Sequence, residues 1–187
     1  MRTVVLLTAL LWLGACARDP LVATTNTVSA GNWRIEKQID RITNAPIESA
    51  LLTAPSSHSG EAFPKKATLQ LGCFNKKPIV RLAFEVKVAT SHSNEFGYRF
   101  DDKPGHQIEA GFLGDDKVAV IENAAEITQF LEELSGAKTL YIRIRSLGHG
   151  RTTAEFNVDG AAAAIAATTA HCPPVIEDDK PKRKFRR

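Results

Sequence analysis

The most regular hydrophobic pattern in the chain lies in residues 68–88, which read TLQLGCFNKKPIVRLAFEVKV. Every second residue is apolar at positions 69, 71 and 73, and again from position 80 to position 88. Strict alternation of this kind is typical of a β-strand with one buried face. The interruption, Asn75-Lys76-Lys77, has the length of a hairpin turn. We therefore predict two antiparallel strands whose leucine and valine side chains line the core.

Weaker alternation predicts further strands on both sides of this hairpin. Residues 55–66, with two prolines and Gly60, interrupt the pattern and are expected to form a surface loop. Gly114-Asp115-Asp116 is expected to be the turn of a second hairpin. The expected strands are residues 33–37, 47–54, 96–100, 107–112 and 117–121.

Two short helices and a third hairpin are predicted in the second half of the chain. Asn123 is suited to cap the first helix, because Glu126 follows three residues later and apolar residues then recur at helical spacing as far as Ser135-Gly136. The second helix is alanine-rich and is expected to begin at Asp159 or Gly160 and to end at about Ala170. A turn centred on His149 would place Leu140 against Val158, Ile142 against Phe156, Ile144 against Ala154, and Arg143 beside Glu155. The fold class is therefore α+β, mainly antiparallel β and β-sandwich-like.

The first residues have the layout of an export signal. A positive start at Arg2 precedes a largely apolar block of ten residues, Val4 to Leu13, which is too short to cross a bilayer permanently, since about 20 apolar residues are needed. Leu13-Gly14-Ala15-Cys16 resembles the lipobox of bacterial lipoproteins, which implies lipid attachment to the sulfur of Cys16 and cleavage before it. Ordinary cleavage after Ala17 is the alternative. By the same resemblance, Ala17 after the cysteine favours the outer membrane.

Four segments follow from these patterns. Residues 1–15 are expected to be a lipoprotein signal peptide and residues 16–31 a flexible tether of small polar residues. Residues 32–172 are expected to form a single disulfide-linked, β-rich domain, and residues 173–187 are expected to form a disordered basic tail. Six Lys or Arg residues lie in 180–187, and without residues 177–187 the chain carries equal numbers of basic and acidic residues. A neutral body argues against nucleic acid as a partner, whereas the tail favours weak contact with an anionic envelope surface.

Cys73 and Cys172 are predicted to form a disulfide, because an exported chain with one even pair most simply oxidises it. Zinc binding and a free thiol nucleophile are weaker alternatives, since no nearby ligand has metal-site spacing. We expect no cofactor and no metal.

The remaining polar residues give no strong catalytic pattern. The five histidines lie in loops or at element ends, and no Gly-x-Ser-x-Gly motif occurs. Asp101-Asp102 and Asp115-Asp116 could supply a glycosidase pair or calcium ligands, but such residues are first of all turn formers. Arg143 and Arg145 could form a basic ligand patch, although a solvated strand face with Glu155 pairing is preferred.

A family resemblance covers Trp33 to Cys172. Leu69-x-Leu71-x-Cys73, Tyr98-Arg99-Phe100-Asp101, Leu140-Tyr141-Ile142-Arg143 and Ala154-x-Phe156-x-Val158-x-Gly160 occur in an order similar to that of the VasI or TagO-like accessory proteins linked to type VI secretion. The resemblance implies an exported accessory protein and transfers no catalytic residues. The leading hypothesis is therefore a non-enzymatic envelope lipoprotein that binds another envelope protein. The alternatives are an envelope hydrolase, a small inhibitor of one, or a carrier of small ligands.

Overall fold

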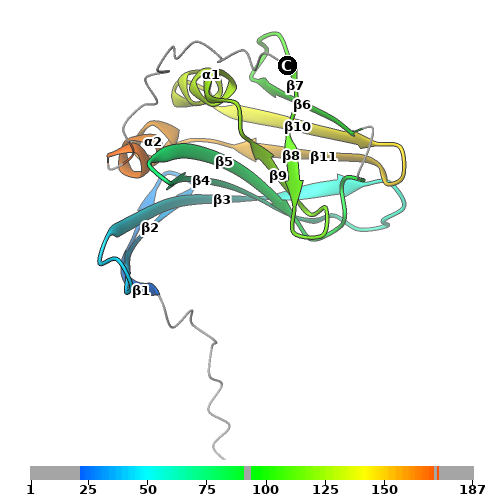
Figure 1. Cartoon of the computed structure of the whole chain (residues 1–187). Coiled ribbons are helices and arrows are strands. Elements are labelled where there is room, and N and C mark those ends of the chain that lie inside the picture. The colour runs from blue at the N-terminus through cyan, green and yellow to red at the C-terminus, as the bar shows by residue number, and fades with distance from the viewer. Residues whose placement is uncertain (1–21, 91–93, 171, 173–187) are drawn as a thin grey trace, which may run out of the picture.

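The computed structural model of the chain describes residues 22–90, 94–170 and 172, and side chains from residue 26 onward. Within these residues the chain forms one curled antiparallel sheet of eleven strands, with two α-helices packed at one end (Figure 1). The strands are β1 (Val22–Ala30), β2 (Trp33–Asp40), β3 (Pro46–His58), β4 (Lys65–Phe74), β5 (Lys77–Phe84), β6 (Asn94–Phe100), β7 (His106–Ile108), β8 (Gly111–Leu113), β9 (Val118–Ile121), β10 (Thr139–Ser146) and β11 (Gly150–Asn157). The helices are α1 (Ala124–Ser135) and α2 (Ala161–Thr169). The predicted fold class is confirmed.

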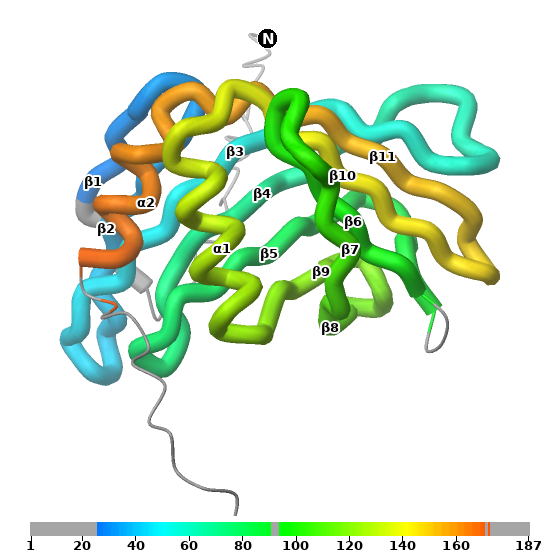
Figure 2. Tube along the Cα trace, turned by 90° about the horizontal axis from the view of Figure 1, so that it is seen from above, coloured from blue at the N-terminus to red at the C-terminus, as the bar shows by residue number. Residues whose placement is uncertain are grey.

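The curl of the sheet follows from one short connection. β7 and β8 lie at opposite ends of the strand order β7-β6-β10-β11-β3-β4-β5-β9-β8, yet only Glu109 and Ala110 separate them in sequence. Three Cα steps of about 3.8 Å cannot cross a flat sheet whose strands are about 4.8 Å apart. The two edges therefore approach each other, as Figure 2 shows. For this reason the single strand predicted over residues 107–112 is divided between the two edges.

β4 and β5 form the predicted hairpin, with Cys73 opposite Pro78. The turn residues Asn75 and Lys76 have φ values of 51° and 62°, as in the type I′ turns whose twist suits a hairpin. β5 ends at Phe84, four residues earlier than predicted. The inward side chains are almost fully buried: Leu69, Leu71, Val80 and Leu82.

β10 and β11 form the third predicted hairpin, but in a register two residues away from the predicted one. Leu140 lies opposite Phe156, not Val158. The turn begins at Ser146, which pairs with Gly150, and the φ of 75° at Gly150 favours glycine. A shift of two residues returns each side chain to the same face. The predicted inward face of this hairpin is therefore correct, although its pairs are not.

β3 is longer than predicted and changes partner along its length. Its first part pairs with β2 as far as Leu51, and its last part, from Ser56 to His58, pairs with β11. Pro55 lies between these two stretches and pairs with neither β2 nor β11. On that side of β3 no hydrogen bond therefore depends on the N–H group that proline lacks. The loop predicted over residues 55–66 is therefore wrong at both ends, because Pro55–His58 belong to β3 and Lys65 and Lys66 to β4.

β1 occupies most of the segment predicted to be a flexible tether. It pairs with β2 from Val22 opposite Asp40 to Ala30 opposite Trp33. The tether prediction for residues 16–31 is therefore wrong over these residues. Five of the nine residues of β1 are Val or Thr, and β-branched side chains favour strands even in a polar segment. The predicted signal peptide, Cys16 and the basic tail lie outside the described residues.

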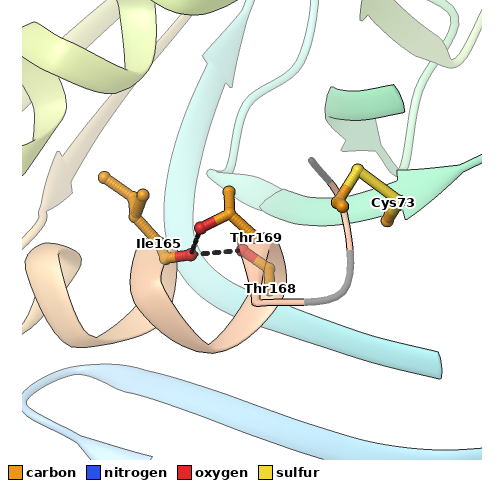
Figure 3. The surroundings of a disulfide bond; sticks show 5 residues. Cys73, Ile165, Thr168 and Thr169 are labelled. Atoms are coloured by element: carbon orange, nitrogen blue, oxygen red, sulfur yellow. Dashed lines mark hydrogen bonds between the residues drawn. A yellow bond between two sulfur atoms is a disulfide. The ribbon is translucent and has the colours of Figure 1, made fainter. Parts of the chain in front are cut away.

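Two attachments hold α2 against the sheet. At its end, the predicted disulfide joins Cys73 of β4 to Cys172, with Cα atoms 5.7 Å apart (Figure 3). At its start, the β1–β2 turn meets the helix backbone to backbone: a Cβ on Gly160 would overlap the carbonyl oxygen of Ala30, and one on Gly31 would overlap that of Asp159. Only glycine permits this approach at the positive φ of both residues, 88° and 56°.

The core fills the space between the curled sheet and the helices. Phe130 of α1 meets Tyr98 and Phe100 of β6 edge to face, with ring centroids 5.0 and 5.1 Å away. α1 is capped as predicted, because the Asn123 side chain accepts the N–H groups of residues 125 and 126. α2 packs its small residues on β2, β3 and β4. Neither helix of the described region is long and apolar enough to span a membrane.

Candidate functional site

The outer face of β6, β10, β11 and β3 carries a groove of about 760 Å³. Because side chains alternate along a strand, the residues between the core positions point outward there. Pro55 and Pro64 lie on one side of the groove, and His106 and Gln107 on the other. The outward residues that line it are Arg99, Tyr141, Arg143, Thr153 and Glu155. The groove is thus made by four neighbouring strands of the sheet, of which only β10 and β11 are consecutive in sequence.

Gly97 forms the floor of the groove beside Arg143. The register places Gly97 between Arg143 of β10 and Gln107 of β7. A Cβ on Gly97 would lie 3.3 Å from the carbonyl oxygen of His106 and 3.8 Å from Nη2 of Arg143. The missing side chain therefore leaves room directly next to the guanidinium group.

Arg143 faces Thr153, not Glu155. The predicted pairing of Arg143 with Glu155 is wrong because of the register shift. Within the described residues no carboxylate lies within 4.0 Å of the Arg143 guanidinium, so its charge faces the groove. Arg145, by contrast, pairs with Glu95 at 3.1 Å. Both partners of that pair are well exposed, and such pairs contribute little to stability.

Arg99 and Tyr141 form the second polar element of the groove. They lie opposite each other on β6 and β10, and the guanidinium carbon of Arg99 is 4.7 Å from the centre of the Tyr141 ring. This is a cation–π contact, which orients both side chains. Glu155 lies on the other side of Tyr141 in the register. The groove therefore offers two guanidinium groups, one aromatic ring and one carboxylate to a ligand.

The His106 wall of the groove is held by contacts to β6 and α1. The His106 ring stacks on Tyr98 with centroids 4.8 Å apart, and its Nε2 lies 3.0 Å from Oε1 of Glu133. The Tyr98 hydroxyl is buried and has no hydrogen-bond partner. Burial, and then the charges of Glu133 and Glu126, raise the pKa of Tyr98 to about 12. Tyr98 therefore stays neutral at physiological pH.

A second, acidic hollow lies where the two edges of the sheet approach. Glu95, Glu109, Asp116 and Glu126 line it. Burial, and then the charge of Glu109, raise the pKa of Glu126 above its usual value. Among the described residues, however, no three His, Cys, Asp or Glu side chains are grouped closely enough to hold a metal ion.

The other residues singled out in the sequence lie apart from the groove. Asp101 accepts the N–H of Thr139 at 2.8 Å, and Asp115 pairs with Lys87 at 2.8 Å, so both act in turns. His58 lies 2.7 Å from the hydroxyl of Thr152. His92 and His171 are outside the described residues, as is Cys16. Of the predicted candidates, the structure places only Arg143 and Glu155 in the groove with His106.

Arg99, Tyr141 and Gly97 were missed as site residues. Each lies at an outward position of a predicted strand, but β6 and β10 are separated by α1 in the sequence, and only the register brings them together. Comparison with protein-family models, with curated proteins and with solved structures found no match for this chain.

Proposed function

We propose that this chain is an envelope lipoprotein, anchored through Cys16 to the outer membrane and facing the periplasm, whose domain binds an acidic segment of another envelope protein without catalysing a reaction. The observation that supports binding is Arg143, whose guanidinium group lies beside a glycine floor with no ion-pair partner in the described part of the chain. The lipobox supports the anchor.

The chemistry of the groove favours a carboxylate ligand. A guanidinium group donates two parallel hydrogen bonds to a carboxylate, and Arg99 adds a second cation held over the Tyr141 ring. Arginine and tyrosine are also the residue types that dominate protein–protein interfaces. The groove is open along the outer face, which suits an extended acidic segment rather than an enclosed small molecule.

Site-specific photo-crosslinking in the producing cells tests this function. A photoreactive residue at the exposed position of Thr153 is expected to give one discrete adduct, and the same residue at Thr128 on α1 is expected to give none. Arg143→Glu should abolish the Thr153 adduct, because it places a negative charge against the acidic ligand. Arg81→Glu, the same change on the outer face of β5, is the matched control and should leave the adduct intact. Equal adducts from the wild type and Arg143→Glu would contradict the proposed ligand.

The anchor is tested separately by the intact mass of the exported protein. Lipidation predicts a chain that begins at Cys16 and carries acyl groups, whereas a lipid-free product beginning at Arg18 would contradict it. The resemblance to VasI or TagO-like proteins extends the proposal to an accessory role in type VI secretion. That extension fails if deleting the gene leaves type VI secretion unchanged.

A further inference from the structure

The start of β1 limits how far the domain can lie from a lipid on Cys16. Val22 is already paired with Asp40 in the sheet. Only six residue steps separate Cys16 from Val22, and such a segment reaches at most about 20 Å when fully extended. If Cys16 is lipidated, as proposed above, the part of the domain around Asp40 is therefore held close to the membrane surface.

Two turns lie at this end of the sheet. Residues 41–45 connect β2 to β3 directly after Asp40, and Asn75 and Lys76 connect β4 to β5. Because Gly72 of β4 lies opposite Ser49 of β3, both turns are at the end where β3 begins. Figures 1 and 2 show them at the same end of the molecule, opposite the β10–β11 turn.

Each of the two turns exposes a large apolar side chain. Ile42 is 74 % exposed and Phe74 is 65 % exposed. Lys76 and Lys77 follow Phe74 after one intervening residue, Asn75. Apolar side chains next to lysines are the composition of surfaces that insert between lipid headgroups, because the hydrocarbon enters the interface while the cations meet anionic phosphates.

The last described residue, Cys172, lies at the same end of the domain. Cys172 is bonded to Cys73, the residue before Phe74. The described chain therefore ends beside the β4–β5 turn, and the fifteen residues that follow Cys172 include six Lys or Arg residues between positions 180 and 187. The first and last described residues, Val22 and Cys172, therefore both lie at the end that exposes Ile42 and Phe74.

We propose that this end of the domain, made by the turn over residues 41–45 and by residues 74–77, is a second membrane contact that inserts Ile42 and Phe74 among the headgroups of anionic phospholipid. This membrane contact rests on the proposed lipid anchor only for the orientation of the domain relative to the membrane. The contact orients the domain, so that the β10–β11 turn points away from the membrane and the groove lies on the outer face of the strands between the two ends.

Vesicle sedimentation of the lipid-free chain tests the contact. The probe is the polypeptide 16–187 with Cys16→Ser, mixed with vesicles of phosphatidylethanolamine and phosphatidylglycerol or of phosphatidylcholine alone. We expect binding to the anionic vesicles only. Ile42→Asp and Phe74→Asp should each weaken it roughly tenfold, since removing one inserted apolar side chain costs about 1.4 kcal/mol or more. Leu147→Asp is the matched control, because Leu147 is 89 % exposed in the β10–β11 turn and should not contact lipid.

Two further measurements separate the turns from the tail. Deleting residues 180–187 should weaken binding to anionic vesicles and reduce its dependence on salt. Ile42→Asp in the shortened chain should weaken the remaining vesicle binding further. In Ile42→Trp, emission should shift to the blue on anionic vesicles and be quenched by brominated lipid, whereas Leu147→Trp should respond to neither. Unchanged binding of the folded Ile42→Asp and Phe74→Asp variants, or binding that vanishes entirely with the tail, would overturn the proposal. The polypeptide used in these measurements carries no lipid. An unmodified Cys16 in cells would therefore refute the lipid anchor without affecting the vesicle-binding result.

Discussion

The surroundings of α2 and the outer-face groove are built in opposite ways. α2 is fixed at both ends, by the Gly31 and Gly160 contact and by the Cys73–Cys172 bond, and its own side chains are mostly alanine. Among the described residues, no disulfide and no close backbone contact joins the two sides of the groove. Its charged side chains are exposed to solvent. The comparison separates residues that hold the fold from residues available to a ligand. Changes around α2 should therefore alter unfolding, and changes in the groove should alter binding.

The largest effect is expected from the disulfide. Cys73→Ala with Cys172→Ala opens a loop with a sequence separation of 99, and the chain-entropy model assigns such a loop about 4 to 5 kcal/mol. Urea unfolding should show a clearly lower midpoint, with α2 exchanging its amide protons first. Cys16→Ala is the control and should unfold like the wild type. Two free thiols in the unreduced, unfolded wild-type protein would show that the bond is absent.

The glycine contact at the start of α2 should come next. Gly160→Ala is expected to lower the free energy of unfolding by about 3 kcal/mol, because the new Cβ meets the Ala30 carbonyl and the φ of 88° is unfavourable. Gly136→Ala is the matched variant at the end of α1, where a Cβ would meet nothing within 4 Å at a φ of −113°. Equal melting temperatures for the two variants would contradict the close contact.

Beneath the groove, Tyr98 predicts a pH effect. Its pKa of about 12 in the folded protein exceeds the ordinary value of 10.0, so the unfolded chain loses its proton first as the pH rises. The stability of the wild type should therefore be fully present below pH 10 and fall by up to about 3 kcal/mol towards pH 12, relative to Tyr98→Phe. Thermal unfolding across this range measures the difference. Below pH 10, Tyr98→Phe should be at least as stable as the wild type, because the buried hydroxyl has no partner to offset the cost of its burial.

The smallest effect on stability is expected in the groove itself. Arg143→Glu should change the free energy of unfolding by less than about 0.5 kcal/mol, because the side chain is exposed and unpaired within the described residues. The same variant should lose the Thr153 crosslink. Loss of both stability and the crosslink would mean that Arg143 stabilises the fold. The groove would then not differ from the surroundings of α2 in the way described above.

The sequence was most informative where a pattern is local. Alternation in residues 68–88 predicted the β4–β5 hairpin, and Asn123 with its following apolar residues predicted α1, because both signals lie within one element. The β10–β11 register failed by two residues because such a shift leaves the buried face unchanged. Alternation cannot distinguish those two pairings; the conformation of Gly150 does.

Non-local features were harder to predict. β1 was missed because its Thr-rich sequence lacks alternation, and it is stabilised by pairing with β2. The division of residues 106–113 between two edges depends on the curl of the whole sheet. The groove needed the register of β6 against β10, which places Gly97 beside Arg143 and Arg99 beside Tyr141. Sequence alone placed Arg143 and Glu155 on the outer face, without showing that a glycine floor lies next to them.

The pairing of β1 also has a mechanical consequence for an anchored chain. A pull on Cys16 would reach the sheet at Val22, opposite Asp40, at the open end of the β1–β2 hairpin. Load applied there separates the two strands one pair at a time, which resists force far less than shearing all pairs together. Peeling nine residues would release about 30 Å of chain, and it would stop where Trp33 donates its indole N–H to Val158. β1 would then act as a reversible extension of the tether. It would detach from β2 when the domain is drawn away from the membrane, and pair with β2 again when the pull ends.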